Sequence, residues 1–244
     1  MTDVDFVIPV YNEEVDLPHS IEKLIKFLLD SDRIIDFSWR IIIVDNGSTD
    51  QTLTVANTLA LTYTSVSVIS LPEKGRGRAL KAAWPSSDSK ILAYMDVDLS
   101  TSLSHIVDLT NSIIFDGFDC SIGSRLMVDS KVSGRSIFRT FLSKSYVLLI
   151  KLLFRSKLSD FQCGFKALRS EVAEQLLPLV EDNFFFFDTE LLLIAEMNRI
   201  KIKQIAVKWD DDPDSRVDVP KTVYQDLCGL LRLRLNINKK VMSI

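Results

Sequence analysis

Two aspartates, Asp96 and Asp98, directly follow the apolar run of residues 91–95. Side chains spaced i, i+2 lie on one face of a strand, or share one turn if the strand ends there. Like charges this close repel each other, and a divalent cation with a preference for hard oxygen ligands, Mg²⁺ or Mn²⁺, removes the repulsion. We therefore hypothesise a metal site that binds a diphosphate. The alternative is that the pair opens a helix capped by Ser100 or Ser102.

The composition narrows the class of protein. The 244 residues, 47% of them hydrophobic, predict one large globular domain, or one and a half, with a sizeable core. The net charge of −4 is negative, so the overall charge does not favour a nucleic-acid partner. Three scattered cysteines and two histidines lack zinc-site spacing, so we expect reduced thiols in a reducing compartment. We expect no signal peptide and no membrane-spanning helix.

Short apolar runs alternate with helical patterns in the first half of the chain. This alternation predicts an α/β fold with a mainly parallel sheet flanked by helices. The expected strands cover residues 4–10, 39–44, 66–71, 91–95 and 118–123, and the main helices cover 21–29, 51–62 and 103–115.

Polar clusters follow four of these strands, at residues 11–14, 45–50, 73–78 and 96–98. In parallel sheets, ligands bind at the carboxyl ends of the strands. Unrelated surface loops would have fallen equally at both edges. The shared edge therefore favours a nucleotide-type site over a helix opening at Asp96.

The segment 131–157 is basic and strongly apolar, with seven lysines and arginines and no acidic residue. We predict a basic amphipathic helix that rests on an anionic membrane surface. A buried helix with cationic ends is the alternative. Beyond it we expect a loop at 160–166, a helix at 191–197, a strand at 202–207, an acidic loop at 210–216 and a helix at 220–235.

Six motifs occur in order along the chain. They are Val7-Ile8-Pro9-Val10-Tyr11-Asn12-Glu13, Val44-Asp45-Asn46-Gly47-Ser48-Thr49-Asp50, Lys74-Gly75-Arg76-Gly77-Arg78-Ala79, Met95-Asp96-Val97-Asp98, Gly123-Ser124-Arg125 and Cys163-Gly164-Phe165-Lys166. Together they resemble the family 2 glycosyltransferases of GT-A fold, from about residue 4 to about residue 209. The most similar branch is the dolichyl- or polyprenyl-phosphate sugar synthases. The run from Gln162 to Lys166 resembles the glucosyl form more than the mannosyl form. Asn46 departs from the family, which often has a second acid there.

The resemblance implies a donor site. Pro9, Tyr11 and Glu13 match the loop that packs on the nucleoside, and Asp45 matches the residue that bonds the base. An Asx turn or helix cap is the alternative role for Asp45. The loop beneath the nucleotide is matched by Lys74, Gly75 and Arg78. The metal motif, matched by Asp96, Val97 and Asp98, would bind Mg²⁺ or Mn²⁺ and the donor.

The resemblance also implies an acceptor site. Arg125 and Arg139 match the pair that holds an acceptor phosphate, which suits the planar guanidinium fork. Surface salt bridges are the alternative role for both. For a hydroxyl acceptor, Asp188 and Asp160 are the candidate catalytic residues, as general base or for positioning. Helix capping ahead of Leu191 is the alternative role for Asp188.

The implied protein is a single GT-A domain over 1–244, with a nucleotide-binding half (1–124) and an acceptor-binding half (125–244). It would transfer a hexose, with inversion, from a nucleotide sugar to a polyprenyl or dolichyl phosphate. UDP-glucose is the favoured donor, and GDP-mannose is the next candidate. The rival functions are transfer to a sugar or protein hydroxyl, a sugar nucleotidyltransferase, and a non-catalytic binding module. We expect a cytoplasmic protein, peripheral on the membrane; a homo-oligomer is compatible with the sequence.

Overall fold

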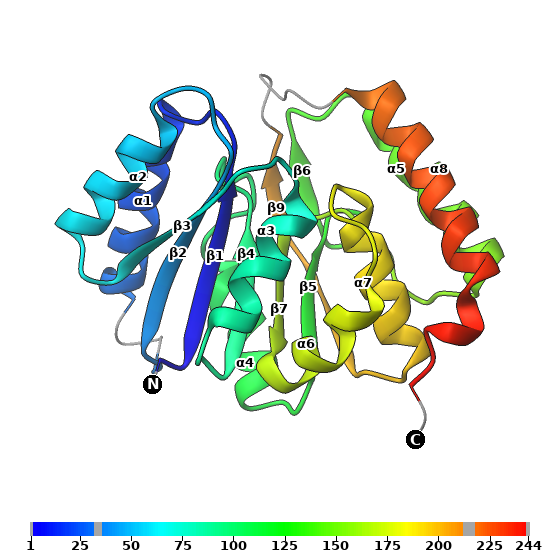
Figure 1. The fold of residues 1–244 in the computed structure, drawn as a ribbon. Coiled ribbons are helices and arrows are strands. Elements are labelled where there is room, and N and C mark those ends of the chain that lie inside the picture. Colours follow the sequence, from blue (N-terminus) through cyan, green and yellow to red (C-terminus); the bar gives the residue numbers. More distant parts are fainter. Residues whose placement is uncertain (1, 32–35, 212–217, 243–244) are drawn as a thin grey trace.

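The computed structural model describes residues 2–31, 36–211 and 218–242. Across these residues, seven strands form one sheet with the order β3-β2-β1-β4-β7-β5-β8 (Figure 1). Its central strands are apolar on both faces, as expected of a sheet covered by helices on both sides. The strands are β1 (Val4–Val10), β2 (Trp39–Asn46), β3 (Val66–Leu71), β4 (Ile91–Met95), β5 (Cys120–Ser124), β7 (Phe165–Arg169) and β8 (Ile202–Ala206).

The sheet is mainly parallel, as predicted, with one reversed strand. β1 runs parallel to β2 and β4, β2 to β3, and β5 to β8. β7 is antiparallel to both β4 and β5. The sequence prediction of a loop over 160–166 was therefore wrong at its end, where Phe165 and Lys166 begin β7. The lysine interrupts the apolar pattern of this strand, although Lys166 pairs in register with Tyr94 and Ile122.

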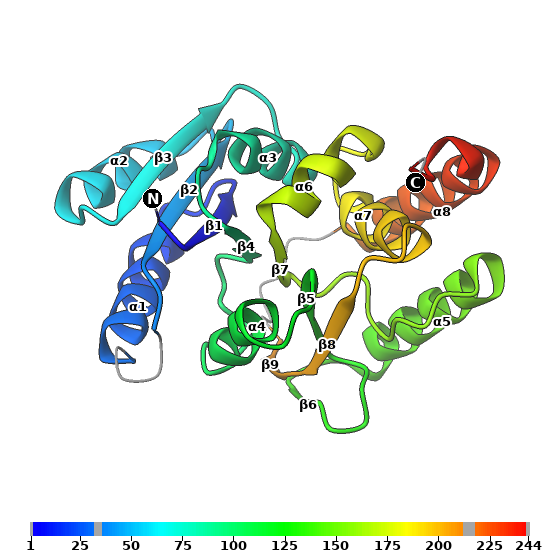
Figure 2. The ribbon, with the colours of Figure 1, turned by 90° about the horizontal axis from the view of Figure 1, so that it is seen from below.

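Helices cover both faces of the sheet (Figures 1 and 2). One face packs on α1 (Asp16–Asp30), α2 (Thr52–Thr62) and α4 (His105–Ile114), and the other on α3 (Arg76–Ala83), α6 (Ser170–Leu176) and α7 (Phe186–Met197). Outside α7 lie α5 (Ile137–Phe154) and α8 (Val219–Leu235). Short 3₁₀ turns occupy Trp84–Ser86, Leu177–Leu179 and Ile237–Lys239. None of the helices in the described part of the chain combines the length and hydropathy needed to cross a bilayer.

The predicted helix over 131–157 is shorter than the sequence suggested. Lys131–Ser133 forms a strand, β6, which pairs in parallel with β9 (Lys208–Asp210). The helix itself begins after Ser136, whose side chain accepts a hydrogen bond from the Arg139 backbone N–H at 3.2 Å. It ends at Phe154, where Arg155 adopts a left-handed conformation (φ +57°).

Most of the apolar surface of α5 is not buried. Val147 and Ile150 are its buried residues, so the buried-helix alternative is wrong for most of its length. The exposed large apolar side chains are Ile137, Phe138, Phe141, Leu148, Leu152 and Leu153.

Two other boundaries differ from the prediction. The helix expected at 191–197 begins earlier, at Phe186. In the acidic segment 210–216, Asp210 belongs to β9 and Asp211 follows it, whereas residues 212–216 lie outside the described residues.

Candidate active site

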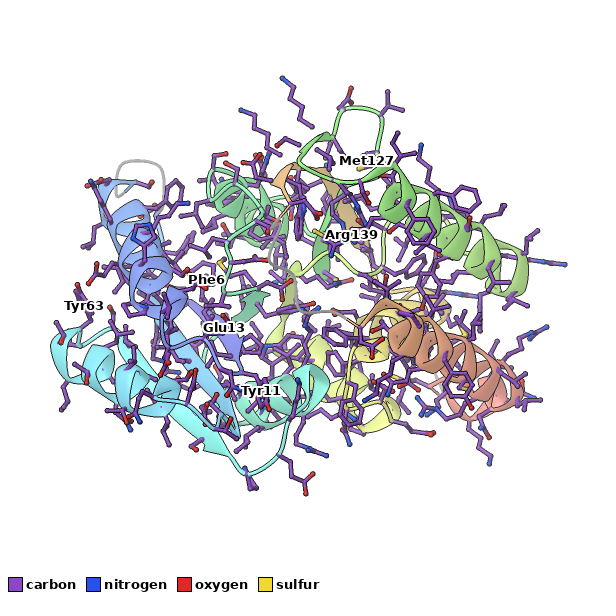
Figure 3. All side chains as sticks on the ribbon, turned by 90° about the horizontal axis from the view of Figure 1, so that it is seen from above. Phe6, Tyr11, Glu13, Tyr63, Met127 and Arg139 are labelled. Atoms are coloured by element: carbon purple, nitrogen blue, oxygen red, sulfur yellow. The ribbon has the colours of Figure 1, made fainter. Side chains whose placement is uncertain are left out.

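The loops after β1 and β2 are bound to each other at the carboxyl edge of the sheet. The Asn12 backbone N–H donates to Ser48 Oγ at 3.0 Å, and the Asn12 side chain accepts from the Thr49 N–H at 2.8 Å. The Glu13 N–H donates to Thr52 Oγ1 at 2.8 Å. The predicted clusters 11–14 and 45–50 are therefore joined. Figure 3 looks onto this edge, with Tyr11 and Glu13 labelled.

Asp45 lies at the end of β2 and is almost completely buried, with 2% of its surface exposed. Its carboxylate accepts a hydrogen bond from the Ser48 N–H at 3.3 Å, so the Asx-type turn predicted as the alternative role is present. Pro9 lies next to the end of β1, in register with Val44. Both residues are thus at the predicted edge.

The glycine-rich loop before α3 reaches the same place. The Lys74 ammonium group lies 3.8 Å from the centre of the Tyr11 ring, which brings together two residues predicted to bind the nucleotide. Gly75 is required by close packing, because a Cβ there would lie 2.4 Å from the Asn183 carbonyl oxygen. The Arg78 guanidinium pairs with Glu73 at 2.5 Å.

The two aspartates of the metal motif occupy a tight turn after β4. The Asp96 N–H donates to the Gly164 carbonyl at 3.1 Å, and the Asp98 carboxylate accepts from the Ser100 N–H at 2.9 Å. The next helix, α4, starts only at His105. The alternative that this pair opens a helix is therefore wrong.

The Asp96 carboxylate packs against bare backbone. A Cβ at position 164 would lie 1.9 Å from Asp96 Oδ2, so glycine is required there. A cavity of about 10 Å³ is lined by Asp96, Asp98, Gly164 and Trp209, among others. That volume suits a ligand the size of one ion or one water molecule.

The electrostatics of this turn favour a cation. Burial raises the pKa of Asp96 to about 6, the Arg76 guanidinium opposes the rise, and the Asp98 charge adds to it. Arg76 Nη2 lies 2.8 Å from Asp96 Oδ1, whereas Asp98 is exposed. The ion pair with Arg76 and the weaker effect of the Lys166 charge therefore do not fully offset the cost of burying Asp96 beside a second carboxylate.

Asp188 lies behind Asp96 in a buried polar cluster that the sequence did not predict. Its carboxylate accepts from the Tyr94 hydroxyl, from Lys166 Nζ at 2.8 Å, and from Arg76 Nη1 at 3.4 Å. All but Arg76 are fully buried. Arg76 therefore bridges Asp188 and Asp96.

Asp188 does not cap the following helix. The N–H groups of Phe184 and Phe187 donate instead to Asp182, at 2.7 and 3.1 Å. The capping alternative for Asp188 is wrong. The sequence signal for its true partner was a lysine, Lys166, inside an apolar strand, because lysine is almost never fully buried unless it is paired.

Arg125 and Asp160 form a buried bidentate ion pair. Arg125 Nε lies 2.8 Å from Asp160 Oδ2, Nη2 lies 2.9 Å from Oδ1, and the Arg125 N–H donates to Oδ2 at 3.0 Å. Burial alone would raise the pKa of Asp160, but the charge and hydrogen bonds of Arg125 lower it to about 2. The guanidinium also lies 4.9 Å from the centre of the Trp209 ring. Arg125 is therefore not a surface salt-bridge residue.

Arg125 is also close to the metal motif. Burial lowers the pKa of its guanidinium, yet the charges of Asp160 and, more weakly, Asp96 raise that pKa above its usual range. Arg125, predicted to bind the acceptor, and Asp96, predicted to bind the metal, thus interact electrostatically.

Arg139, on α5, pairs with a carboxylate near the surface. Its Nη1 lies 2.8 Å from Asp211 Oδ2, and 31% of its side chain is exposed. Figure 3 labels Arg139 together with Tyr11 and Glu13. The salt bridge expected as its alternative role is present.

The metal-binding chemistry fits the two aspartates. Among the described residues, no group of three or more His, Cys, Asp or Glu side chains is arranged to hold a metal ion. Mg²⁺ and similar ions are commonly bound through one or two carboxylates together with substrate phosphates. Asp96 and Asp98 supply that number of ligands, and the Arg76 guanidinium does not fully neutralise their negative charge.

A mainly parallel sheet with two aspartates at its carboxyl edge, among loops suited to a nucleotide, defines the nucleotide-sugar transferase class of GT-A fold. The chain belongs to glycosyl transferase family 2, whose model matches residues 5–177. The sequence prediction of the family is therefore confirmed.

Curated relatives and a solved structure agree with this class. The chain is 32% identical to "Glycosyltransferase AglD" of Haloferax volcanii over 91% of its own length and 35% of that protein. It is 29% identical to "Dolichyl-phosphate beta-glucosyltransferase" of Dictyostelium discoideum over 93% of its length and 72% of that protein. The chain thus spans about a third of the first relative and most of the second.

Glucosyl-3-phosphoglycerate synthase of Mycobacterium tuberculosis, solved with Mn²⁺, UDP and glucosyl-3-phosphoglycerate, has a similar fold. The TM-score is 0.68 at 18% sequence identity, over 95% of this chain and 79% of the other. This similarity confirms the predicted fold.

Proposed function

We propose that this chain transfers glucose from UDP-glucose to a polyprenyl or dolichyl phosphate, with inversion at the anomeric carbon and with Mg²⁺ or Mn²⁺ as cofactor. The observation that carries the proposal is the position of the buried Arg125 guanidinium, 4.9 Å from the centre of the Trp209 ring, which itself lines the cavity beside Asp96 and Asp98. A cation beside the donor site suits an acceptor that is itself an anion. The Dictyostelium relative is named for glucosyl transfer to dolichyl phosphate, and the mycobacterial neighbour was solved with UDP and Mn²⁺.

The two carboxylates predicted as candidate bases, Asp160 and Asp188, favour a phosphate acceptor over a hydroxyl. A hydroxyl nucleophile needs a general base whose pKa lies near the working pH, whereas an ionised phosphate needs none. With a pKa of about 2, Asp160 is too weak a base to take a hydroxyl proton. Asp188 is fully buried and already bonded to Tyr94 and Lys166. We therefore assign Asp160 and Asp188 to positioning, of Arg125 and Arg76 respectively.

The donor would be held by the loops at the carboxyl edge. Asp45 would bond the base, Pro9, Tyr11 and Glu13 would pack on the nucleoside, and the loop from Lys74 to Arg78 would lie beneath it. A metal ion held by Asp96 and Asp98 would neutralise charge on the diphosphate. Arg76 is a further cation beside the same carboxylates, at 2.8 Å from Asp96.

The proposed reaction is a single displacement. A phosphate oxygen of the acceptor forms a bond to the anomeric carbon, and the bond from that carbon to the diphosphate oxygen breaks. UDP leaves with the electron pair, and no proton is transferred. Arg125 and Arg139 would hold the acceptor phosphate for attack opposite the leaving group. Inversion follows from attack on that face.

We also propose that α5 and α8 rest on the membrane that carries the lipid acceptor. The two helices contact each other at one end of the molecule (Figures 1 and 2). Lysines and arginines accompany their apolar side chains, as in helices that bind anionic lipid surfaces. The exposed apolar residues of α8 are Val223, Tyr224, Leu227, Leu231 and Leu235.

The other rival functions have less support. A nucleotidyltransferase usually has a glycine-rich loop after its first strand, where this chain has Pro9-Val10-Tyr11-Asn12-Glu13. A non-catalytic module would be expected to lack part of the metal motif, and here Asp96 and Asp98 are both present.

The test follows a labelled sugar into the lipid phase. The protein is incubated with polyprenyl phosphate and either UDP-[¹⁴C]glucose or GDP-[¹⁴C]mannose, with Mn²⁺ or with EDTA. We expect label from UDP-glucose to enter the organic phase, with at least a tenfold loss in EDTA and a similar loss in Asp98→Ala. Label that never enters the organic phase from either donor would refute the proposal, and full activity in Asp98→Ala would refute the metal assignment.

A further inference from the structure

Arg135 sits at a fixed point between the β6–β9 ribbon and α5. Gly134 before it has a φ of +71°, and a Cβ there would lie 3.2 Å from the Asp211 carbonyl oxygen. Ser136 after it caps α5. The backbone on both sides is therefore held, and the Arg135 side chain starts from a defined position.

The Arg135 guanidinium runs along the face of α5 that carries Arg139. Its Nη2 donates to Ser143 Oγ at 2.7 Å. Ser143 lies four residues after Arg139, on the same helical face. The charges of Arg125, Asp160, Asp211 and Arg139 all act on the Arg135 guanidinium, although burial is the largest cause of its lowered pKa. Arg135 is thus the neighbour of both predicted acceptor arginines.

Arg135 is the incompletely bonded member of this arginine group. Its Nε and Nη1 are buried and have no hydrogen-bond partner among the described residues. A buried, charged donor without a partner is costly, and such groups normally have one. A structural role alone does not account for two unused donors on one side chain.

The positive charge of Arg135 has no ion-pair partner among the described residues, unlike the charges of Arg125 and Arg139. Asp160 pairs with Arg125 and Asp211 pairs with Arg139, whereas no ion pair to Arg135 occurs within the described ranges. Among the residues that the structure describes, three guanidinium groups of this cluster therefore share two carboxylates. The uncompensated charge coincides with the unused donors.

We propose that Arg135 binds the phosphate of the acceptor, with its Nε and Nη1 groups as donors. The inference rests on the proposed function and adds a third arginine to the two that the family resemblance implies. Because Arg125 and Arg139 already have carboxylate partners, Arg135 supplies the charge that attracts the anion. The diphosphate of the donor is the other phosphate in the site, so the experiment must separate the two.

The experiment compares Arg135→Gln with the parent protein in steady-state transfer to polyprenyl phosphate, and in UDP binding with Mn²⁺. We expect the KM for polyprenyl phosphate to rise about tenfold to a hundredfold, which corresponds to one charged hydrogen-bonded contact. The Kd for UDP should stay within twofold. Arg135→Lys, which keeps the charge, should recover part of the loss.

Two exposed cations serve as controls. Lys23→Gln removes a charge from α1, and Arg199→Gln repeats the substitution after α7. Both residues are exposed and lie outside the helices proposed to rest on the membrane, so both variants should leave the KM within twofold. The thermal midpoint of Arg135→Gln should not fall, because the removed charge has no carboxylate partner. If Arg135→Gln does not fold, Arg135→Lys takes its place in the test. For Arg135→Lys we expect a KM for polyprenyl phosphate at least about threefold above that of the parent protein.

Each result bears on a different claim. An unchanged KM in Arg135→Gln, with the parent protein active, overturns the role of Arg135 and leaves the proposed function intact. A rise in the Kd for UDP equal to the rise in KM also overturns it, because Arg135 would then act on the donor. A parent protein that transfers nothing to polyprenyl phosphate would overturn both.

Discussion

The proposed donor site depends most on Asp96. It lies in contact with Arg76, with the bare backbone of Gly164, and within the field of Asp98 and Arg125. The buried side chain of Asp188 holds Arg76 from the other side. Each of these contacts fixes where the Asp96 carboxylate points, so small changes in its surroundings should alter metal-dependent binding before they alter the fold.

Gly164→Ala tests this dependence. The added methyl group would lie 1.9 Å from Asp96 Oδ2, so the carboxylate must move. We expect the affinity for UDP in Mn²⁺ to fall by about tenfold or more, since metal ligands must be held within about half an ångström of their working positions. Isothermal titration of UDP with Mn²⁺ measures the effect.

The matched control is Gly117→Ala. A Cβ at Gly117 meets nothing within 4 Å, although its φ of +72° brings backbone strain. That variant should lose stability without losing UDP affinity. Equal losses of affinity in both variants would mean that the effect of Gly164→Ala is general destabilisation and not displacement of Asp96.

The sequence could place most of the predicted site residues at one edge of the sheet, because they follow its strands. The partners that hold them could not. Tyr94, Lys166 and Arg76 meet at Asp188 only because β7 is inserted between β4 and β5, which no local pattern records. Arg135 was visible as one of seven basic residues, but its unused donors are a property of the folded chain.

The helices α5 and α8 expose apolar side chains that do not pack in the core. The sequence predicted a basic apolar helix but placed its start six residues too early, since Lys131–Ser133 pairs with β9. That pairing joins segments more than seventy residues apart, which the spacing of apolar side chains cannot reveal. The first five strands and helices, by contrast, follow local periodicity, and each of their ends was predicted within five residues.

The double variant Phe138→Ser/Phe141→Ser tests the role of the α5 face. Both phenylalanines are about two-thirds exposed, so their loss should cost little stability. We expect the parent protein to sediment with vesicles of phosphatidylcholine and phosphatidylserine, and the variant to bind at least tenfold more weakly, because two buried aromatic side chains are removed from the membrane contact.

Leu61→Ser is the control for the vesicle measurement. Leu61 is 89% exposed on α2, at the far end of the molecule from α5 (Figure 1). It should bind vesicles like the parent protein. If the double variant sediments as well as Leu61→Ser, or if the parent protein does not sediment at all, the face does not contact the membrane.

At the scale of the whole molecule, one sheet carries both predicted halves. The residues predicted to bind the donor come from 1–124, and the arginines predicted to bind the acceptor come from 125–244. Because β7 pairs with strands from the first half on both sides, the two groups lie on a common support. The ion pair between Arg76 and Asp188 crosses the division. This arrangement suits a reaction that needs a donor and an acceptor at a fixed separation.

The proposed acceptor is an ionised phosphate, which needs no general base. The most direct test compares polyprenyl phosphate with polyprenol of the same chain length, with UDP-glucose and Mn²⁺ at pH 7. We predict a kcat/KM at least about a hundredfold higher for the phosphate, the smaller of the factors that a general base typically supplies. Glucosylation of the free alcohol at an equal or higher kcat/KM would contradict the account.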